Sequence, residues 1–227
     1  MKILARGTNL QTEELKQKLS SVDIDLICED ENTISVCKDE TFLAIFDLNA
    51  DDAKFNPLAA YNDLITTPVF VAAVKKSLAM MAQTHQQKIN FPLFGINALP
   101  TFINRSIAEI SVFNSAQKNC LEIIFSNLNW NFKLVDDRVG MVTPRVLFMI
   151  INEACYTLEE GTATINDIDI AMKLGTNYPF GPFEWADKIG IKPIYETLNA
   201  LFEDTQDERY KICPLLKTKY LRGEKFF

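Results

Sequence analysis

The pattern of apolar residues changes near Val135, and this change limits the folds open to the chain. Before it, short apolar runs typical of strands alternate with helical segments. After it, apolar residues recur at helical spacing and strand signals almost vanish. The sequence therefore predicts an α/β domain over residues 1–135 and an all-helical domain over residues 136–227.

The first segment has the order strand, glycine turn, helix with which a dinucleotide-binding fold begins. Ile3–Ala5 is a short apolar run, Gly7 lies in the turn, and residues 13–19 are amphipathic. Such a turn normally carries G-x-G-x-x-G, so that the backbone can approach a pyrophosphate, and here only Gly7 is present. Glu29 follows the next apolar run, about 22 residues after Gly7 (29 − 7), near where an acid would hold a ribose. Gly7 and Glu29 are the candidate cofactor-binding residues, although surface acids after a strand are common.

The rest of the first domain mixes strands and helices. The sequence predicts strands over residues 24–28, 33–37, 42–46, 91–96, 107–112 and 132–135, and helices over residues 57–82 (broken at 65–68) and 116–128. The segment between the second and fourth strands of the chain is short, so it holds a hairpin but no further strand-helix unit. We therefore expect a shortened Rossmann-like domain.

The second domain reads as a series of helices. They are expected over residues 142–160, 164–174, 182–189, 192–202 and 214–221. Gly161 is predicted to end the first of them, and Gly175 the second. Thr164 or Asn166 is the expected N-cap of the second helix.

Composition excludes several classes of function. The net charge of −7 in 227 residues disfavours binding to nucleic acid. Five cysteines without a C-x-x-C pair and a single histidine disfavour a metal site and indicate a reduced, cytoplasmic setting. We expect no signal peptide and no membrane span, because no apolar run approaches about 20 residues.

One long segment carries a specific motif. Residues 152–190 read NEACYTLEEGTATINDIDIAMKLGTNYPFGPFEWADKIG, and DERYKICPLL follows downstream. The segment resembles the C-terminal domain of the 3-hydroxyacyl-CoA dehydrogenases, with N/E-E-A, E-x-G-x-A-x-x-x-D-I-D-x-A-M-K-L-G and Y-P-x-G-P-F-x-x-x-D-x-x-G in order. The resemblance covers most of residues 136–216 and implies a helical domain that forms a homodimer and one wall of an acyl-CoA cleft. Phe180, Phe183 and Trp185 then serve as core, as cleft wall, or as both.

The first domain resembles the same family through FPLFGINALPTFINRSIAEIS and DDRVGMVTPRVLFMIINEA. The family oxidises a 3-hydroxyacyl thioester with NAD, using a histidine base that a glutamate orients about twelve residues later. Here Asn97 stands at the histidine position, and Glu109 (109 − 97 = 12) at that of the glutamate. An asparagine amide cannot accept a proton near pH 7.

Other family positions also differ. Pro144 stands where the resemblance implies an active-site asparagine, and proline has no N–H to donate. The family's serine-rich loop is represented at best by Thr66 or Thr67, whose spacing to Asn97 is too long to assign a role. His85 is either a relocated base or a solvated surface residue.

The resemblance leaves three functions open. The first is an active NAD-dependent 3-hydroxyacyl-CoA dehydrogenase of fatty-acid or butanoate metabolism. The second, which the residues favour, is a family member with impaired or lost oxidation that retains dimerisation, with or without acyl-CoA binding. The third is a different CoA-linked activity with Glu109 as a carboxylate base. NAD is the cofactor expected for the family, and the single glycine puts its binding here in doubt.

Overall fold

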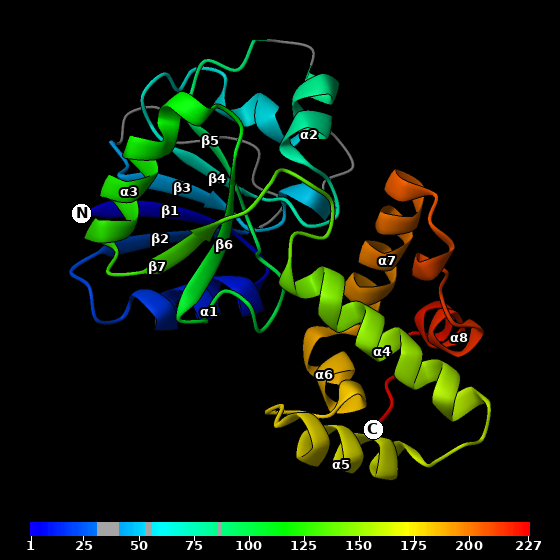
Figure 1. Cartoon of the computed structure of the whole chain (residues 1–227). Coiled ribbons are helices and arrows are strands. Elements are labelled where there is room, and N and C mark those ends of the chain that lie inside the picture. The colour runs from blue at the N-terminus through cyan, green and yellow to red at the C-terminus, as the bar shows by residue number, and fades with distance from the viewer. Residues whose placement is uncertain (31–40, 53–55, 86–87) are drawn as a thin grey trace. The chain divides into compact units, whose positions relative to one another are not determined.

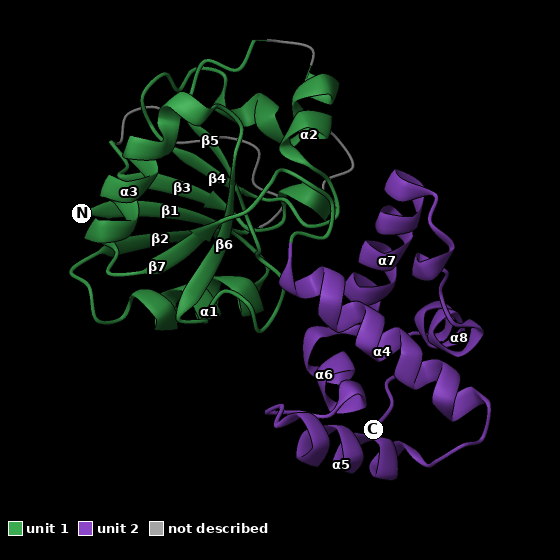
Figure 2. Cartoon of the chain, in the orientation of Figure 1, with its two compact units in different colours: residues 1–141 green, residues 142–227 purple. Residues whose placement is uncertain are grey.

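A computed structural model describes residues 1–30, 41–52, 56–85 and 88–227 (Figure 1). The chain divides into two compact units, unit 1 over residues 1–141 and unit 2 over residues 142–227 (Figure 2). Unit 1 is α/β and unit 2 contains helices without strands among the residues described, so the predicted fold class is confirmed.

The division between the units falls after Met141, whereas the sequence pattern changes near Val135. Residues 136–141 remain with unit 1 because they are tied to it by hydrogen bonds. Asp137 accepts hydrogen bonds from the amides of Leu78 and Ala79, at 2.7 and 2.9 Å. Apolar periodicity does not register such polar anchors, so it places the change in pattern earlier.

The described part of unit 1 contains one sheet with the strand order β2-β1-β3-β4-β5-β6-β7. Its strands are β1 (Lys2–Gly7), β2 (Asp25–Asp30), β3 (Ala44–Asp47), β4 (Val69–Ala72), β5 (Leu93–Ile96), β6 (Ile107–Val112) and β7 (Asn131–Leu134). The first five are parallel, β6 is antiparallel to β5, and β7 is parallel to β6. Because β2 and β3 lie on opposite sides of β1, the order in which strands are added to the sheet reverses between β1 and β3. The carboxyl ends of β1 and β3 flank this point of reversal. That is the place where open α/β sheets bind ligands.

The helices of unit 1 connect these strands. They are α1 (Asn9–Leu19), α2 (Leu78–His85) and α3 (Lys118–Asn127), with short 3-10 turns η1 (Ala50–Asp52), η2 (Pro57–Tyr61) and η3 (Ser115–Gln117). The helix expected over residues 57–82 is wrong for its centre, which forms β4. A strand buried on both faces is a continuous apolar run, and periodicity alone cannot separate it from a buried helix. The strand expected over residues 33–37 lies outside the described residues.

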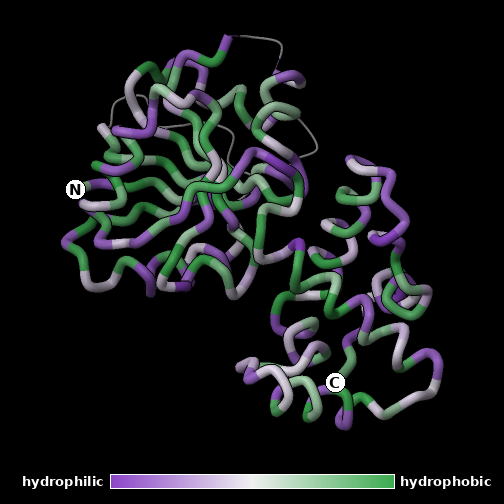
Figure 3. The backbone as a smooth tube through the Cα atoms, viewed as in Figure 1, coloured by the Kyte–Doolittle hydropathy of each residue, from purple (hydrophilic) through white to green (hydrophobic). Residues whose placement is uncertain are grey.

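Aromatic side chains form the core on one face of the sheet. Phe46, Phe70 and Phe94 are register partners on β3, β4 and β5, and their rings stack at centroid distances of 4.8 and 4.9 Å. Leu15 of α1 and Phe125 of α3 belong to the same buried cluster, so both helices cover this face. The strands form the hydrophobic interior of unit 1 in Figure 3.

Unit 2 follows the predicted helices closely. They are α4 (Thr143–Glu159), α5 (Ile165–Thr176), α6 (Pro182–Ile189), α7 (Ile191–Thr205), η4 (Glu208–Tyr210) and α8 (Pro214–Arg222). Thr164 caps α5, and Gly161 has the left-handed φ of +73° expected after the end of α4. The predicted stop at Gly175 is wrong, because α5 continues through it to Thr176 and is capped by Asn177, whose φ is 56°.

The motif residues of unit 2 hold its helices together. Asp169 of α5 is buried and accepts hydrogen bonds from the amides of Phe183 and Glu184, at 2.8 and 2.9 Å, so it caps α6. A Cβ at Gly181 would lie 2.2 Å from Asp169 Cγ, so only glycine fits there. Asn152 of α4 bonds to the Lys211 carbonyl and the Cys213 amide, fixing the chain before α8. The D-I-D and G-P-F elements therefore have structural roles in this chain.

Candidate functional site

Asn97 and Glu109 lie side by side in unit 1. Asn97 directly follows β5 and Glu109 lies on β6, and the antiparallel register that pairs Ile96 with Ile110 places the two residues opposite each other. The Asn97 amide N–H donates to the Glu109 carbonyl at 3.2 Å, and Asn97 Nδ2 lies 3.5 Å from Glu109 Oε2. Asn97 is 5% exposed. The pair has hydrogen-bond geometry, and the only titratable side chain in it is the glutamate.

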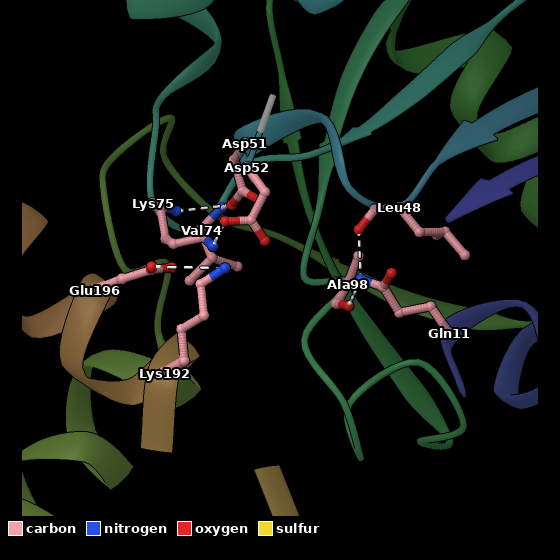
Figure 4. Close-up of polar contacts among 9 residues, drawn as sticks. All are labelled: Gln11, Leu48, Asp51, Asp52, Val74, Lys75, Ala98, Lys192 and Glu196. Carbon is pink, nitrogen blue, oxygen red and sulfur yellow. Dashed lines mark hydrogen bonds and ion pairs between the residues drawn. The ribbon is translucent and has the colours of Figure 1, made fainter. Parts of the chain in front are cut away.

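The turn that contains Gly7 is filled by a glutamine side chain. Gln11 Oε1 accepts hydrogen bonds from the amide and hydroxyl of Thr8, at 3.0 and 2.9 Å. Gln11 Nε2 donates to the carbonyls of Leu48 and Ala98, at 2.6 and 3.0 Å (Figure 4). The amide thus joins the chain after β1, β3 and β5, and its hydrogen-bonding capacity is fully used. A Cβ at Gly7 would lie 3.0 Å from Leu48 Cβ and 3.1 Å from Gln11 Oε1, so this packing accounts for the glycine.

Glu29 takes part in a row of charges across the sheet. In the register of the sheet Arg6 on β1 lies opposite both Glu29 on β2 and Asp47 on β3. Arg6 Nη2 donates to Glu29 Oε2 at 3.0 Å and Nη1 donates to the Tyr61 hydroxyl at 3.1 Å. Tyr61 in turn donates to Asp47 Oδ2 at 2.6 Å. We call these four residues the Arg6 network.

Burial dominates the electrostatics of the Arg6 network. Arg6 and Asp47 are 4% and 5% exposed, and Tyr61 is fully buried. Burial raises the pKa of the Asp47 carboxyl, while the Tyr61 hydrogen bond and the Arg6 charge oppose that rise. Burial and the nearby Asp47 charge raise the pKa of Tyr61 well above its ordinary value, so the phenol keeps its proton.

A second polar cluster follows β3 and β4. Asp51 is buried and accepts hydrogen bonds from the amides of Val74 and Lys75, both at 2.9 Å (Figure 4). The Lys75 ammonium forms an ion pair with Asp52. Burial raises the pKa of Asp51, and Lys75 opposes the rise. These contacts tie together the ends of β3 and β4, and the chain after β3 also carries Leu48, whose carbonyl accepts from Gln11.

His85 is not a solvated surface residue, as one of its two predicted roles required. It lies at the end of α2, is 4% exposed, and its Nδ1 is 2.7 Å from Asn56 Nδ2. Burial lowers its pKa, which favours the neutral ring. Its partner Asn56 precedes η2 and is not part of the Asn97 pair, so this contact does not support the relocated-base role.

The hydroxyl candidates Thr66 and Thr67 precede β4, at the amino ends of the parallel strands. Asn97 follows β5 at the opposite edge, so the structure does not bring them together. Ser77 follows β4 at the same edge as Asn97 and accepts the Met80 amide at 3.2 Å. The sequence does not single it out, because the apolar run before it favours a helix. Pro144 lies buried in the first turn of α4, where the absence of an N–H is tolerated.

Sequence reasoning also misses Arg6, Gln11, Asp47 and Tyr61. An arginine inside the apolar run of β1 is the available signal, since a charged residue in a buried strand requires a partner. Within the described ranges no group of three or more His, Cys, Asp or Glu residues is arranged to hold a metal ion. None of the helices described is long and apolar enough to cross a membrane.

Unit 1 is an open, mostly parallel α/β sheet, and unit 2 is a set of helices. Residues 140–225 match the family model described as 3-hydroxyacyl-CoA dehydrogenase, C-terminal domain. This region is therefore similar to the C-terminal domain of the 3-hydroxyacyl-CoA dehydrogenases.

Individual relatives match the same region. The chain is 43% identical over 88 residues to the 3-hydroxybutyryl-CoA dehydrogenase of Bradyrhizobium diazoefficiens, covering 39% of this chain and 30% of that protein. It is 42% identical over 87 residues to the 3-hydroxyadipyl-CoA dehydrogenase of Escherichia coli, covering 38% of this chain and 18% of that protein. The matched segment thus spans less than a third of either relative.

A solved structure matches the fold along the whole chain. The crystal structure of M. tuberculosis FadB2 aligns with 99% of this chain and 97% of its own, at a TM-score of 0.76 and 14% identity. At that identity the likeness concerns the fold alone. The fold is therefore shared over both units, while the close sequence relationship is confined to the helical one.

Proposed function

We propose that the chain is a 3-hydroxyacyl-CoA dehydrogenase-family protein of fatty-acid or butanoate metabolism in which NAD-dependent oxidation of 3-hydroxyacyl-CoA is impaired or lost. The observation that carries the proposal is the Asn97–Glu109 pair, which has the contact expected of a catalytic dyad and lacks its base.

The missing base is decisive for the chemistry. Oxidation of a hydroxyl requires that its proton leaves as the hydride is transferred, and a positioned base contributes about 10²–10⁴-fold to such a step. The Asn97 amide can donate to Glu109 but cannot take up a proton near neutral pH. Glu109, which in the family orients the base, here faces an amide in place of that base. Pro144 supports the same conclusion, because it removes a second hydrogen-bonding side chain.

The proposal is tested by the oxidation of NADH with acetoacetyl-CoA, followed by absorbance. We expect the chain to run at least about 10²-fold below an active family member assayed in parallel. Asn97→His is expected to raise the rate, with Asn97→Gln as the control that restores no base. Wild-type turnover at the rate of the active enzyme would contradict the proposal and favour the active dehydrogenase.

Two other activities are outcomes of related assays. Binding of an acyl-CoA without turnover would support a non-catalytic acyl-CoA-binding role. Turnover of a CoA thioester that Glu109→Gln abolishes, with no NADH consumed, would support the carboxylate-base activity.

The cysteines described in the structure are free thiols, which supports our proposal of a cytoplasmic location.

We also propose that unit 2 forms a homodimer, as the family resemblance implies. Ile170 and Leu174 stand four residues apart on α5 and are 56% and 82% exposed, so one side of this helix presents apolar surface. Leu174→Glu is expected to shift the sedimentation of the full chain from dimer to monomer at micromolar concentration. A wild-type chain that sediments as a monomer would contradict the dimer, and Thr218→Glu at an exposed position of α8 controls for the added charge.

A further inference from the structure

We infer that the side chains of Gln11 and Arg6 take the hydrogen-bonding positions of a bound dinucleotide, so that the protein itself closes the carboxyl edge of the sheet to NAD. The inference rests on the proposed loss of dehydrogenase activity and deepens it, because it names what replaces the cofactor. It is drawn from unit 1 alone.

The phosphate end of the edge is closed by Gln11. A pyrophosphate needs open space beside the turn after β1 and free amides at the start of α1. The amide of Thr8 is bonded to Gln11 Oε1, and the amide of Gln11 is bonded to Thr8 Oγ1 at 3.4 Å. The Gln11 side chain is 7% exposed and packs against the face of Gly7. The space beside Gly7, where a phosphate would lie, is therefore filled by the Gln11 side chain.

The ribose end is closed by Arg6. An acid that holds a ribose must have a carboxylate oxygen free to accept from its hydroxyls. One of the two Glu29 oxygens, Oε2, is instead paired with the buried Arg6 guanidinium at 3.0 Å, which also sets the orientation of the carboxylate. Arg6 also donates to Tyr61, so the guanidinium cannot leave without breaking its hydrogen bonds to both Glu29 and Tyr61. Arg6 supplies the hydrogen bond to Glu29 that a ribose would supply.

The two replacements act at the same structural point. Gln11 bonds the carbonyl of Leu48, and Asp47 of the Arg6 network is the preceding residue. Displacing Gln11 would leave the carbonyls of Leu48 and Ala98 without this donor, in an interior where unmet hydrogen bonds are costly. Binding of a dinucleotide thus requires rupture of contacts that stabilise the empty fold.

The first test is calorimetric titration of the full chain with NADH and, separately, with ADP-ribose. We expect no saturable binding up to about 1 mM, which is weaker than a free energy of about −4 kcal/mol. A micromolar Kd for either compound overturns the inference. NADH binding without turnover overturns it and leaves the proposed loss of activity standing, whereas NADH turnover overturns both.

The second test asks whether Gln11 is part of the fold. Gln11→Ala is expected to lower the thermal midpoint of unfolding by about 4–8 °C, because a buried amide with four hydrogen bonds is lost. Gln17→Ala, the same change at an exposed position of α1, is the matched control and is expected to stay within about 2 °C. Equal midpoints for Gln11→Ala and wild type would overturn the inference.

Discussion

Replacement of Gly181 by alanine is expected to destabilise unit 2 by about 3–5 kcal/mol, whereas the same change at Gly175 is expected to be neutral or stabilising. A Cβ added at Gly181 would lie 2.2–2.4 Å from three atoms of the Asp169 side chain, so Asp169 or the turn must move. Overpacking costs about 1–3 kcal/mol, and loss of each hydrogen bond to a charged group adds about 1.5–3 kcal/mol. Movement of Asp169 weakens its bonds to both the Phe183 and Glu184 amides.

Gly175 supplies the control because it belongs to the same motif in a different setting. It lies inside α5, and nothing stands within 4 Å of a Cβ built on it. A glycine in a helix interior costs about 1 kcal/mol relative to alanine, so Gly175→Ala is expected to raise stability by up to that amount. Urea denaturation followed by circular dichroism measures both variants. Similar midpoints for the two would show that the Asp169 contact does not control the packing of α5 on α6.

The helical unit was predictable because its signals are local. Caps, helical spacing and glycine turns lie within a few residues of the boundaries they set, as Thr164 and Gly161 show. The helix end predicted at Gly175 is wrong because the sequence does not reveal whether a glycine ends a helix or lies inside it. The helix predicted over the β4 segment is wrong for a related reason, since its apolar run is compatible with both a buried strand and a buried helix.

The candidate site was predictable only where neighbours in the sheet are near in sequence. Asn97 directly follows β5 and Glu109 lies on the next, antiparallel strand, so a spacing of twelve residues already suggests that they meet. The Arg6 network instead joins residues up to 55 positions apart, and its centre Tyr61 comes from a short 3-10 turn with no periodic signal. Gln11 likewise reaches Ala98, 87 positions away. Such long-range polar contacts can be predicted only after the strand order of the sheet is known.

Replacement of Arg6 by methionine is expected to destabilise unit 1 by about 3–5 kcal/mol at neutral pH, because removal of one partner leaves buried charge uncompensated. Asp47 and Glu29 would lose their shared cation, while methionine retains much of the packing volume. The second substitution Asp47→Asn in the Arg6→Met chain removes one of the unpaired charges and still accepts from the Tyr61 hydroxyl. We expect it to restore part of the lost stability, which urea denaturation of the single and double variants measures.

The pH dependence separates lost charge pairing from lost packing. Burial already raises the pKa of Asp47, and loss of the Arg6 charge raises that pKa further. A carboxyl whose pKa is higher in the folded than in the unfolded state favours folding at low pH and loses that contribution as pH rises through the folded value. The penalty of Arg6→Met should therefore be smaller at about pH 5 than at about pH 8, and Asp47→Asn should flatten the difference. A penalty that is the same at both pH values would mean that Arg6 stabilises the edge by packing, and that its charge does not hold the network together.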